Sequence, residues 1–232
     1  MARALPYLLL VLLACGRTAA PPKVPPAPEA AAMEPAPAAE PESVVARTDA
    51  EALGCPPVFP ASVRATWQDI SGERYRIDAS GRPEQAIALL PPIGADARDE
   101  GCQGDVGRWG DALPGDDDYD GGHLIGAQLG GWGGRANMVP QIANFNRGNW
   151  LQMENAVASC AGELEDGQLR YTVTVAYDDV DTLVPSTMQM ALDDLETEQS
   201  ITLVFANAVQ GGPDGTATRE RGVQWLRDLG CE

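Results

Sequence analysis

Histidine is almost absent from this sequence, because the 232 residues contain only His123. A metal site that needs two histidines from one chain is therefore excluded. If the protein uses an imidazole for acid–base chemistry, that imidazole belongs to His123, since histidine ordinarily titrates near neutral pH. Lysine is as scarce, and Lys23 is the only one. No lysine follows the glycine-rich stretch at 130–134, so this stretch lacks the ending of a phosphate-binding P-loop and is expected to be a flexible connection.

Positive charge is also in short supply. The chain has 16 basic and 34 acidic residues, which gives a formal net charge of −18. A surface this acidic repels polyanions at long range, so the composition argues against nucleic acid as a partner. Any inference that the chain binds nucleic acid must therefore rest on local chemistry.

The first residues are typical of an export signal. A short basic start precedes an apolar run at 5–13, which is too short to span a bilayer as a mature helix. The sequence LLAC at 12–15 resembles a bacterial lipoprotein signal, which implies a signal peptide at 1–14 and a lipid on Cys15. We expect an outer membrane lipoprotein on the periplasmic or the cell-surface face. The alternative is an ordinary secretory peptide that is cut near residues 19–20.

The composition changes after the signal. Residues 15–50 are dominated by Pro, Ala and Glu without apolar periodicity, which predicts an extended tether. Residues 51–232 remain, enough for one domain with a sizeable core. Four cysteines lie in that domain: Cys55, Cys102, Cys160 and Cys231. An even number in an exported chain predicts two disulfides, and all three connectivities are open.

The clearest helix is predicted at about 144–160. At helical spacing, Trp150, Met153, Val157 and Cys160 share one face, and Asn146 begins that stripe. Alternating apolar residues predict strands at 74–78, 84–90, 169–177 and 201–206. The last apolar stripe predicts a final helix at 219–229. The glycine- and acid-rich stretch at 94–115 is expected to be a loop, and 188–195 is either a short helix or a loop. The pattern predicts an α+β fold with a mainly antiparallel sheet and one principal helix.

Three short motifs stand in the middle of the domain. DGGH occupies 120–123, NMVPQ occupies 137–141, and a helix motif follows with Asn146, Trp150 and Glu154 at spacings of four. Taken singly, a histidine, an asparagine and a glutamate are more often structural than catalytic. Together they resemble the DNA/RNA non-specific endonuclease family, the ββα-metal or His-Me finger nucleases, whose motifs are D-R-G-H and N-x-x-x-W-x-x-x-E. The chain is more similar still to a toxin-like bacterial branch of the family, which has G-G-H-L-I and an upstream Y-x-x-D-x-x-G-R. Residues 75–82 resemble this upstream motif.

The resemblance implies a ββα-metal core and a metal-dependent, sequence-non-specific endonuclease that hydrolyses phosphodiester bonds of DNA, RNA or both. By resemblance, His123 is the general base, and Asn146 holds one divalent cation. The expected ion is Mg²⁺, which Mn²⁺ can replace. Glu154 accepts a hydrogen bond from a metal-bound water or orients Asn146. Asp120 positions the segment that carries His123.

The motif departs from the family at one position, where Gly121 replaces an arginine that would face phosphate. Arg82, Arg98 and Arg147 are the candidates to supply that charge. The acidic composition and the lost arginine favour an alternative, a catalytically inactive surface lipoprotein that keeps the nuclease scaffold. A third alternative is a calcium-stabilised surface protein, although the acidic loop at 116–121 lacks the acidic twelfth residue of an EF-hand. Nothing in the sequence identifies an inhibitor protein.

Overall fold

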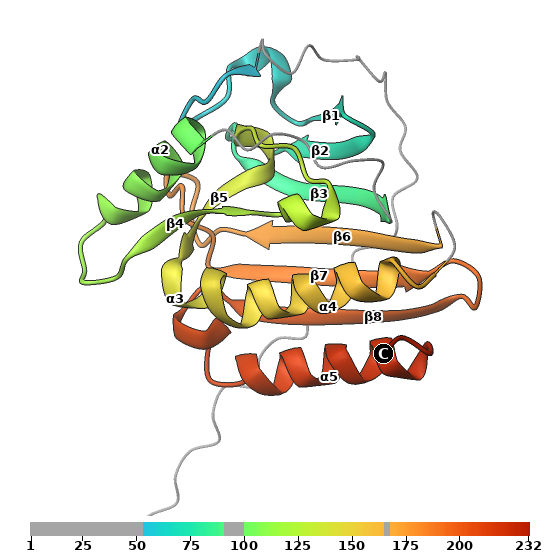
Figure 1. The fold of residues 1–232 in the computed structure, drawn as a ribbon. Helices are drawn as coiled ribbons and strands as arrows, with labels where there is room; N and C mark the ends of the chain where they lie inside the picture. The colour runs from blue at the N-terminus through green and yellow to red at the C-terminus, as the bar shows by residue number, and fades with distance from the viewer. Residues whose placement is uncertain (1–52, 91–99, 165–167) are drawn as a thin grey trace, which may run out of the picture. The chain divides into compact units, whose positions relative to one another are not determined.

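A six-stranded sheet lies at the centre of the domain in a computed structural model of the chain, which describes residues 53–90, 100–164 and 168–232. Its strands follow the order β1-β2-β3-β6-β7-β8, and every neighbouring pair is antiparallel. The bounds, in chain order, are β1 Thr66–Ile70, β2 Glu73–Ile77, β3 Pro83–Leu90, α2 Glu100–Asp111, β4 Tyr119–His123, β5 Met138–Ile142, α3 Ala143–Phe145, α4 Leu151–Ala161, β6 Leu169–Ala176, β7 Thr187–Asp194, β8 Gln199–Ala206 and α5 Gly215–Asp228. The expected α+β class is confirmed (Figure 1).

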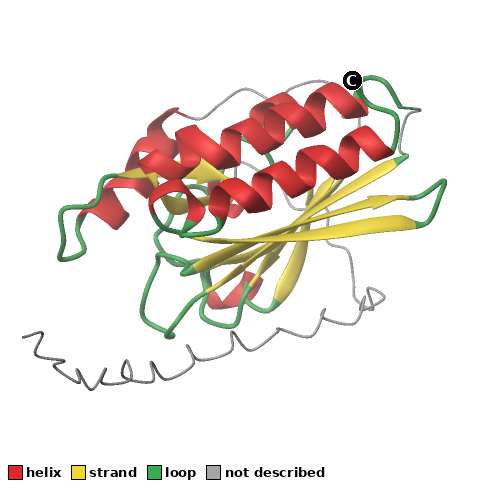
Figure 2. Ribbon diagram, turned by 90° about the horizontal axis from the view of Figure 1, so that it is seen from below, coloured by secondary structure: helices red, strands yellow, loops and turns green. Residues whose placement is uncertain are grey.

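Two helices cover one face of this sheet. Helices α4 and α5 lie side by side over it (Figure 2). On β6, Leu169, Tyr171, Val173 and Val175 are buried and alternate with more exposed residues. Successive side chains of a strand point to opposite faces, so this alternation places the apolar set beneath the helices. The predicted strand at 169–177 is confirmed.

Most of the other predicted elements are also present. The hairpin predicted at 74–78 and 84–90 is β2 paired with β3, and the strand at 201–206 lies within β8. The helix predicted at 219–229 corresponds to α5, which begins four residues earlier and ends one residue earlier. The prediction for 188–195 is wrong in both of its forms, because this segment is β7. Strand β7 lies between β6 and β8 in the sheet. Its alternating apolar side chains, Met188, Met190 and Leu192, are buried, as expected for an interior strand.

The loop expected at 94–115 is wrong for its larger part, because α2 occupies Glu100–Asp111. Glycines recur at every third position of this helix, a composition that normally disfavours helices. Glycine here allows the backbone of α2 to approach that of β4 closely. A Cβ on Gly107 would lie 2.9 Å from the carbonyl oxygen of Tyr119 in β4, closer than a side chain tolerates. The glycines therefore let α2 pack directly on β4.

Strands β4 and β5 form a separate two-stranded antiparallel sheet, and the helical segment follows directly. This is the ββα order that the motifs predicted. The single regular helix expected at about 144–160 is interrupted, however. Short α3 leads into a π-helical turn at Asn146–Trp150, with non-helical backbone angles at Gly148, and α4 then begins. Such wider turns are rare and are frequent at functional sites.

The π-helical turn separates Asn146 from the buried stripe. Trp150, Met153, Val157 and Cys160 are all buried, as predicted. Asn146 was expected to begin this stripe, but it is only half-buried and faces a cleft instead. The extra residue in the wide turn changes the direction in which Asn146 projects relative to α4.

An aromatic cluster fixes this turn on the sheet. The ring of Trp150, which is fully buried, lies 5.7 Å from the ring of Phe145 and 5.9 Å from that of Phe205 on β8. Edge-to-face pairs of this kind each contribute about 0.5–1.5 kcal/mol beyond the area they bury. The tryptophan of the helix motif is therefore an anchor that holds Asn146 in place.

Both expected disulfides are present, and the structure selects one of the three connectivities. Cys55 pairs with Cys102, which ties the start of the domain to α2. Cys160 pairs with Cys231, which ties the end of α4 to the carboxyl end of the chain. Cys15, the signal peptide at 1–14 and the tether at 15–50 lie outside the described residues.

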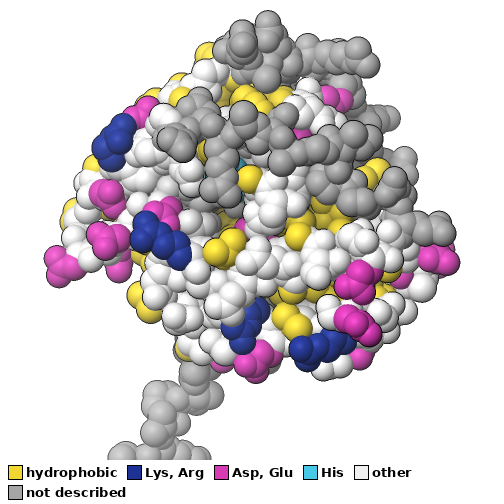
Figure 3. Space-filling view, in the orientation of Figure 1, with side chains coloured by type: hydrophobic (Ala, Val, Ile, Leu, Met, Phe, Trp, Pro, Cys, Tyr) yellow, Lys and Arg dark blue, Asp and Glu magenta, His cyan; other side chains and the backbone are white. Residues whose placement is uncertain are grey.

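The described residues all belong to one structural unit. Within them, no helix has the length and apolar character that crossing a membrane requires. On the face drawn in Figure 3, the arginines of the described part are scattered among acidic side chains and do not gather into a basic stripe. Any attraction for a polyanion on this face must therefore be local.

Candidate active site

A cleft of about 340 Å³ opens where β4, the π-helical turn and the start of α4 meet. Its lining contains all four residues that the motifs assigned to catalysis or metal binding. The lining residues are Gln103, Asp120, His123, Gly126, Ala127, Gln128, Asn146, Arg147, Leu151 and Glu154. Residues 31 positions apart in sequence, from His123 to Glu154, therefore share one cavity.

His123 is the last residue of β4 and pairs with Met138 at the start of β5. The side chain lines the cleft, and the residue is only 9% exposed. The hairpin that carries it allows no side chain at Gly122, where a Cβ would lie 2.0 Å from Oε1 of Gln141. The glycine of the DGGH motif next to the histidine therefore serves close packing of the two strands.

The loop after His123 is folded around the side chain of Asn137. Its Nδ2 donates to the carbonyl oxygens of Ile125 at 2.9 Å and Trp132 at 2.8 Å, and its Oδ1 accepts from the amide of Ile125 at 2.8 Å. The backbone oxygen of Asn137 also accepts from Leu124. Asn137, the first residue of the NMVPQ motif, thus fixes the backbone on both sides of the loop and with it the end of β4.

Asp120 connects the two halves of the cleft. Its carboxylate accepts a hydrogen bond from Nδ2 of Asn146 at 2.9 Å and two more from Arg147, at 2.8 and 2.6 Å. Asp120 was expected to position the segment that carries His123. The contacts of its side chain run instead to the π-helical turn, so its carboxylate orients Asn146 and Arg147.

The amide of Asn146 has a defined direction as a result. Its nitrogen donates to Asp120, and because the oxygen and nitrogen of a planar amide diverge from one carbon, fixing the nitrogen also fixes the direction of the oxygen. Oδ1 of Asn146 is thus directed away from Asp120. An oxygen held in this way suits a hard divalent cation, which prefers amide and carboxylate oxygens.

Glu154 lies one helical turn into α4 and is 5% exposed. Its Oε2 accepts a hydrogen bond from Nε2 of Gln128 at 3.2 Å. Tyr171 lies nearby, and burial first, then the Glu154 carboxylate, raises the pKa of Tyr171 well above its usual range. The tyrosine therefore stays protonated, and its hydroxyl donates to the carbonyl oxygen of Leu124 at 3.3 Å.

The three candidate arginines have different positions. Arg147 lines the cleft, and its side chain is 73% exposed while it is paired with Asp120. The hydrogen bond to Asp120, and then the charge of that carboxylate, raise the pKa of Arg147. Arg98 lies outside the described residues.

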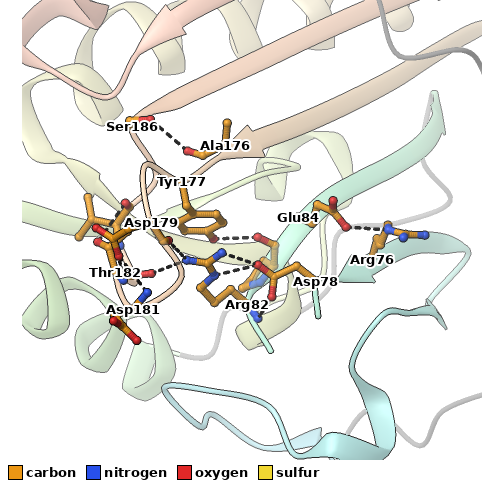
Figure 4. A network of polar contacts seen from close by, with 12 residues as sticks. Arg76, Asp78, Arg82, Glu84, Ala176, Tyr177, Asp179, Asp181, Thr182 and Ser186 are labelled. Atoms are coloured by element: carbon orange, nitrogen blue, oxygen red, sulfur yellow. Dashed lines mark hydrogen bonds and ion pairs between the residues drawn. The ribbon is translucent and has the colours of Figure 1, made fainter. Parts of the chain in front are cut away.

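Arg82 lies away from the cleft. Figure 4 shows its guanidinium between the Asp78 carboxylate and the carbonyl oxygens of Asp179 and Thr182, against the ring of Tyr177. The residue is only 7% exposed. Its cation therefore holds the loop after β6, and among the described candidates only Arg147 lines the cleft.

Arg135, which no sequence motif singled out, is fully buried. Its guanidinium lies 5.2 Å from the ring centroid of Trp109 on α2 and donates to the carbonyl oxygen of Met138 opposite His123. Burial lowers its pKa to about 10. A single arginine in a glycine-rich stretch carries no signal of burial, so the sequence alone did not indicate this contact.

Gln103 and Gln128 were also missed, although both line the cleft. Gln103 comes from α2, which was expected to be a loop. Gln128 lies in the loop after His123 and contacts Glu154. No residue pattern around either glutamine distinguishes it from a surface residue, so only the fold brings them to the site.

The cleft contains donors for a metal ion, but few charged ones. In residues 53–90, 100–164 and 168–232, no three histidine, cysteine or acidic side chains gather as a ready-made metal site. The side chains with oxygen donors that line the cleft are the carboxylates of Asp120 and Glu154 and the amides of Asn146, Gln103 and Gln128. This chemistry fits Mg²⁺, which binds few protein ligands and keeps several waters.

A comparison with protein families decides the class of this chain. The family model described as DNA/RNA non-specific endonuclease matches residues 64–195. The chain belongs to this family. The protein is therefore a nuclease, and its substrates are nucleic acids. The match to the nuclease family includes the whole cleft, whereas β8 and α5 follow it.

Comparisons with individual proteins add little to the family assignment. No curated protein matches the nuclease. Two crystal structures of NucA from Streptococcus agalactiae are similar to it, one with no metal bound and one with magnesium bound. Each alignment has 18% sequence identity and covers 59% of this chain and 70% of NucA, with TM-scores of 0.41 and 0.42 respectively.

Proposed function

We propose that this nuclease is a metal-dependent, sequence-non-specific endonuclease that hydrolyses phosphodiester bonds of DNA, RNA or both. One observation carries the proposal: His123 and Asn146, from β4 and from the π-helical turn, line the same cleft. Phosphodiester hydrolysis needs an activated water and neutralised charge on the phosphate. The two side chains supply the base and a metal ligand for these tasks.

His123 is the general base in this proposal. Its imidazole takes a proton from the water that attacks phosphorus, a role that typically contributes about 10²–10⁴-fold to the rate. The β4–β5 pairing and the loop held by Asn137 fix the backbone from which the ring projects. The burial of His123 limits the positions that its ring can adopt, which favours one productive geometry.

Asn146 would hold the cation through its amide oxygen, and Glu154, which lies in the same cleft, would accept a hydrogen bond from a water of the cation's shell. When bound, a divalent ion supplies neutralisation of charge on the phosphate and on the leaving oxygen. Asp120 fixes the direction of the Asn146 amide, so the carboxylate acts as a positioning residue. Mg²⁺, or Mn²⁺ in its place, fits these oxygen donors.

Arg147 binds the phosphate in place of the arginine that the family motif carries at position 121. Its guanidinium is held by Asp120 and exposed at the mouth of the cleft. A planar guanidinium suits the oxygens of a phosphate. The net charge of −18 slows the approach of long polyanions, so we expect binding to depend strongly on Mg²⁺ and on local arginines.

A nuclease assay with plasmid DNA and with RNA tests this function. The purified protein should degrade one or both substrates with Mg²⁺ or Mn²⁺, and EDTA should stop the reaction. His123→Ala should lower the rate by about 10²–10⁴-fold, and added imidazole should restore part of it, because a diffusible base replaces the missing ring. Asn146→Ala should raise the Mg²⁺ concentration needed for half-maximal activity.

Each assignment has its own contradicting result. A His123→Ala protein with the wild-type rate would remove the assigned base. An Asn146→Ala protein with an unchanged metal requirement would remove the assigned ligand. If the folded wild-type protein hydrolyses no nucleic acid with any divalent ion, the inactive scaffold becomes the better description.

The two disulfides support a further part of the proposal, that the domain works outside the cytoplasm. Disulfides persist in oxidising compartments and are rare in the cytosol. We propose an outer membrane lipoprotein anchored through Cys15. Cell fractionation should find the wild-type protein in the membrane and the Cys15→Ser protein in a soluble fraction, whereas membrane retention of Cys15→Ser would contradict the anchor.

A further inference from the structure

A second hollow, of about 310 Å³, lies beside the cleft between α2 and β4. We call it the α2 groove. It is lined by residues of both elements, among them Gly104, Gly107 and Arg108 of α2 and Tyr119 of β4. The α2 groove and the cleft share two lining residues, Gln103 and Asp120. The two hollows therefore adjoin, and a polymer bound in the cleft can continue along α2.

The α2 groove exists because helix and strand meet through glycines. A Cβ on Gly121 of β4 would lie 2.2 Å from the carbonyl oxygen of Gln103, and one on Gly107 would lie 2.9 Å from that of Tyr119. Neither position can carry a side chain while α2 stays in place. The surface of the α2 groove at these positions is consequently formed by backbone atoms. The absence of side chains there leaves room for an extended chain.

Arg108 is the only cationic side chain among the described residues that line the α2 groove. Its side chain is 68% exposed, and its partner Asp105, one helical turn earlier, is 45% exposed. An exposed ion pair of this kind contributes little, about 0–1 kcal/mol. The guanidinium of Arg108 can therefore exchange Asp105 for a phosphate at small cost.

The acidic residues of the α2 groove already have partners. Asp120 is bonded to Asn146 and Arg147, and Oδ1 of Asp111 accepts from the backbone amide of Tyr119 at 2.8 Å. Their charge is partly balanced within the protein. Arg108 thus remains as the group that a phosphate in the groove would meet.

We propose that a nucleic-acid strand extends from the cleft along the α2 groove, where Arg108 binds a phosphate that flanks the scissile one. This inference rests on the proposed function, since it assumes that the cleft cleaves the strand. The backbone of α2 leaves no room for an arginine at position 121. The same helix carries Arg108, which lies on that side of β4. Arg108 is then a substrate-binding residue that favours substrates longer than a single diester.

The test compares two substrates in steady-state kinetics with Mg²⁺. One is a single-stranded oligonucleotide of about 12 nucleotides, and the other is bis(p-nitrophenyl) phosphate, which is too short to enter the α2 groove. Arg108→Ala should raise KM for the oligonucleotide about 10-fold, as expected for one lost charge-assisted contact. The same variant should leave hydrolysis of the small diester unchanged.

Two further variants separate phosphate binding from helix stability. Asp105→Ala releases Arg108 from its partner, so it should lower KM for the oligonucleotide, the opposite of Arg108→Ala. Arg227→Ala removes an exposed arginine from α5 and serves as a control for the loss of one positive charge. The Arg108→Ala protein should also show a salt dependence of binding that is weaker by about 0.7–0.9 in log–log slope, as for one lost phosphate contact.

The outcomes distinguish the two proposals. If the wild-type protein cleaves both substrates and Arg108→Ala leaves KM for the oligonucleotide unchanged, only the α2 groove is contradicted. If Arg108→Ala and Asp105→Ala raise KM alike, the ion pair supports the helix and the groove proposal is again wrong. If the wild-type protein cleaves neither substrate, the proposed function fails and the groove proposal fails with it.

Discussion

Asp120 accepts two hydrogen bonds from the guanidinium of Arg147, from Nε at 2.8 Å and from Nη2 at 2.6 Å. The same carboxylate accepts a third bond from Nδ2 of Asn146 at 2.9 Å. One acidic side chain on β4 therefore sets the direction of two side chains on the π-helical turn. This relationship joins the strand that carries His123 to the turn that carries the proposed metal ligand.

Replacing Asp120 should impair metal binding without unfolding the protein. Asp120→Ala removes all three bonds, so the Asn146 amide loses its fixed direction. Groups that orient metal ligands typically contribute about 10- to 100-fold to activity or metal affinity, and we expect a loss of that size. The measurement is nuclease activity as a function of Mg²⁺ concentration. Asp117→Asn, an exposed acid in the preceding loop, is the control for the change in charge. An unchanged Mg²⁺ requirement in Asp120→Ala would contradict the role of Asp120.

The sequence was most informative where one physical rule dominates. Period-two alternation predicted β6, and the stripe from Trp150 to Cys160 predicted α4, because each element buries one face. The same rules failed for α2, whose glycines have low helix propensity, although Gly107 and Gly110 are required by the contact with Tyr119 of β4. They also failed for β7, whose strand conformation is fixed by its pairing on both edges, with β6 and with β8.

The candidate site divides in the same way. The motifs identified His123, Asn146 and Glu154, and the fold brings all three to one cleft. Motif spacing did not reveal the π-helical turn, because residues four apart also fit a regular α-helix. The contact between Asp120 and Arg147 joins two segments that are 27 residues apart, so it depends on the hairpin and could not be read from either segment.

Removal of the Cys55–Cys102 disulfide should affect the cleft as well as stability. The bond closes a loop with a sequence separation of 47 residues, for which chain entropy gives a stabilisation of up to about 4 kcal/mol. Cys102 directly precedes Gln103, which lines the cleft. Cys55→Ser with Cys102→Ser should therefore lower Tm and also reduce activity at temperatures where the protein is folded.

The other disulfide provides the matched comparison. Cys160→Ser with Cys231→Ser opens a loop with a separation of 71 residues, so it should lower Tm by a similar or greater amount. It lies at the far end of α4 from the proposed metal ligand, and we expect a smaller loss of activity. The two double variants are compared at temperatures where the same fraction of each protein is folded. Equal losses of activity would then show that α2 has no particular role in the cleft.

Tyr171 should make stability depend on alkaline pH. Burial raises its pKa in the folded state, whereas the unfolded chain ionises at about pH 10. Above that pH the unfolded state loses a proton that the folded state keeps, so each further pH unit should remove about 1.4 kcal/mol of stability until the folded pKa is reached. Tyr171→Phe lacks this term.

The two proteins can be compared by chemical denaturation between pH 8 and pH 11. At pH 8, Tyr171→Phe should be less stable by about 0.5–1.5 kcal/mol, because the hydrogen bond to Leu124 is lost. The difference should shrink as the pH rises past about 10. Other groups that titrate at alkaline pH are common to both proteins and cancel. A difference that stays constant from pH 8 to pH 11 would contradict the raised pKa.

Restoring the family arginine at position 121 should damage this protein. A Cβ on Gly121 would lie 2.2 Å from the carbonyl oxygen of Gln103 and 2.9 Å from its carbonyl carbon, so the obstacle is the backbone of α2 and not a flexible side chain. Gly121→Ala already forces α2 away from β4, and Gly121→Arg must do the same. We expect both to lower the free energy of unfolding by about 1–3 kcal/mol or more, the usual range for overpacking, and to lower activity as the cleft wall moves.

Gly104→Ala on α2 is the matched control for Gly121→Ala. The nearest atom to a Cβ there is Nη1 of Arg108 at 3.4 Å, at the end of an exposed and flexible side chain. Alanine has a higher helix propensity than glycine, so Gly104→Ala should be neutral or stabilise the protein by up to about 1 kcal/mol. Thermal unfolding of the three variants measures the difference. If Gly121→Arg folds with the wild-type Tm and raises activity, then α2 does not pack on β4 as described, and the absence of the arginine has another cause.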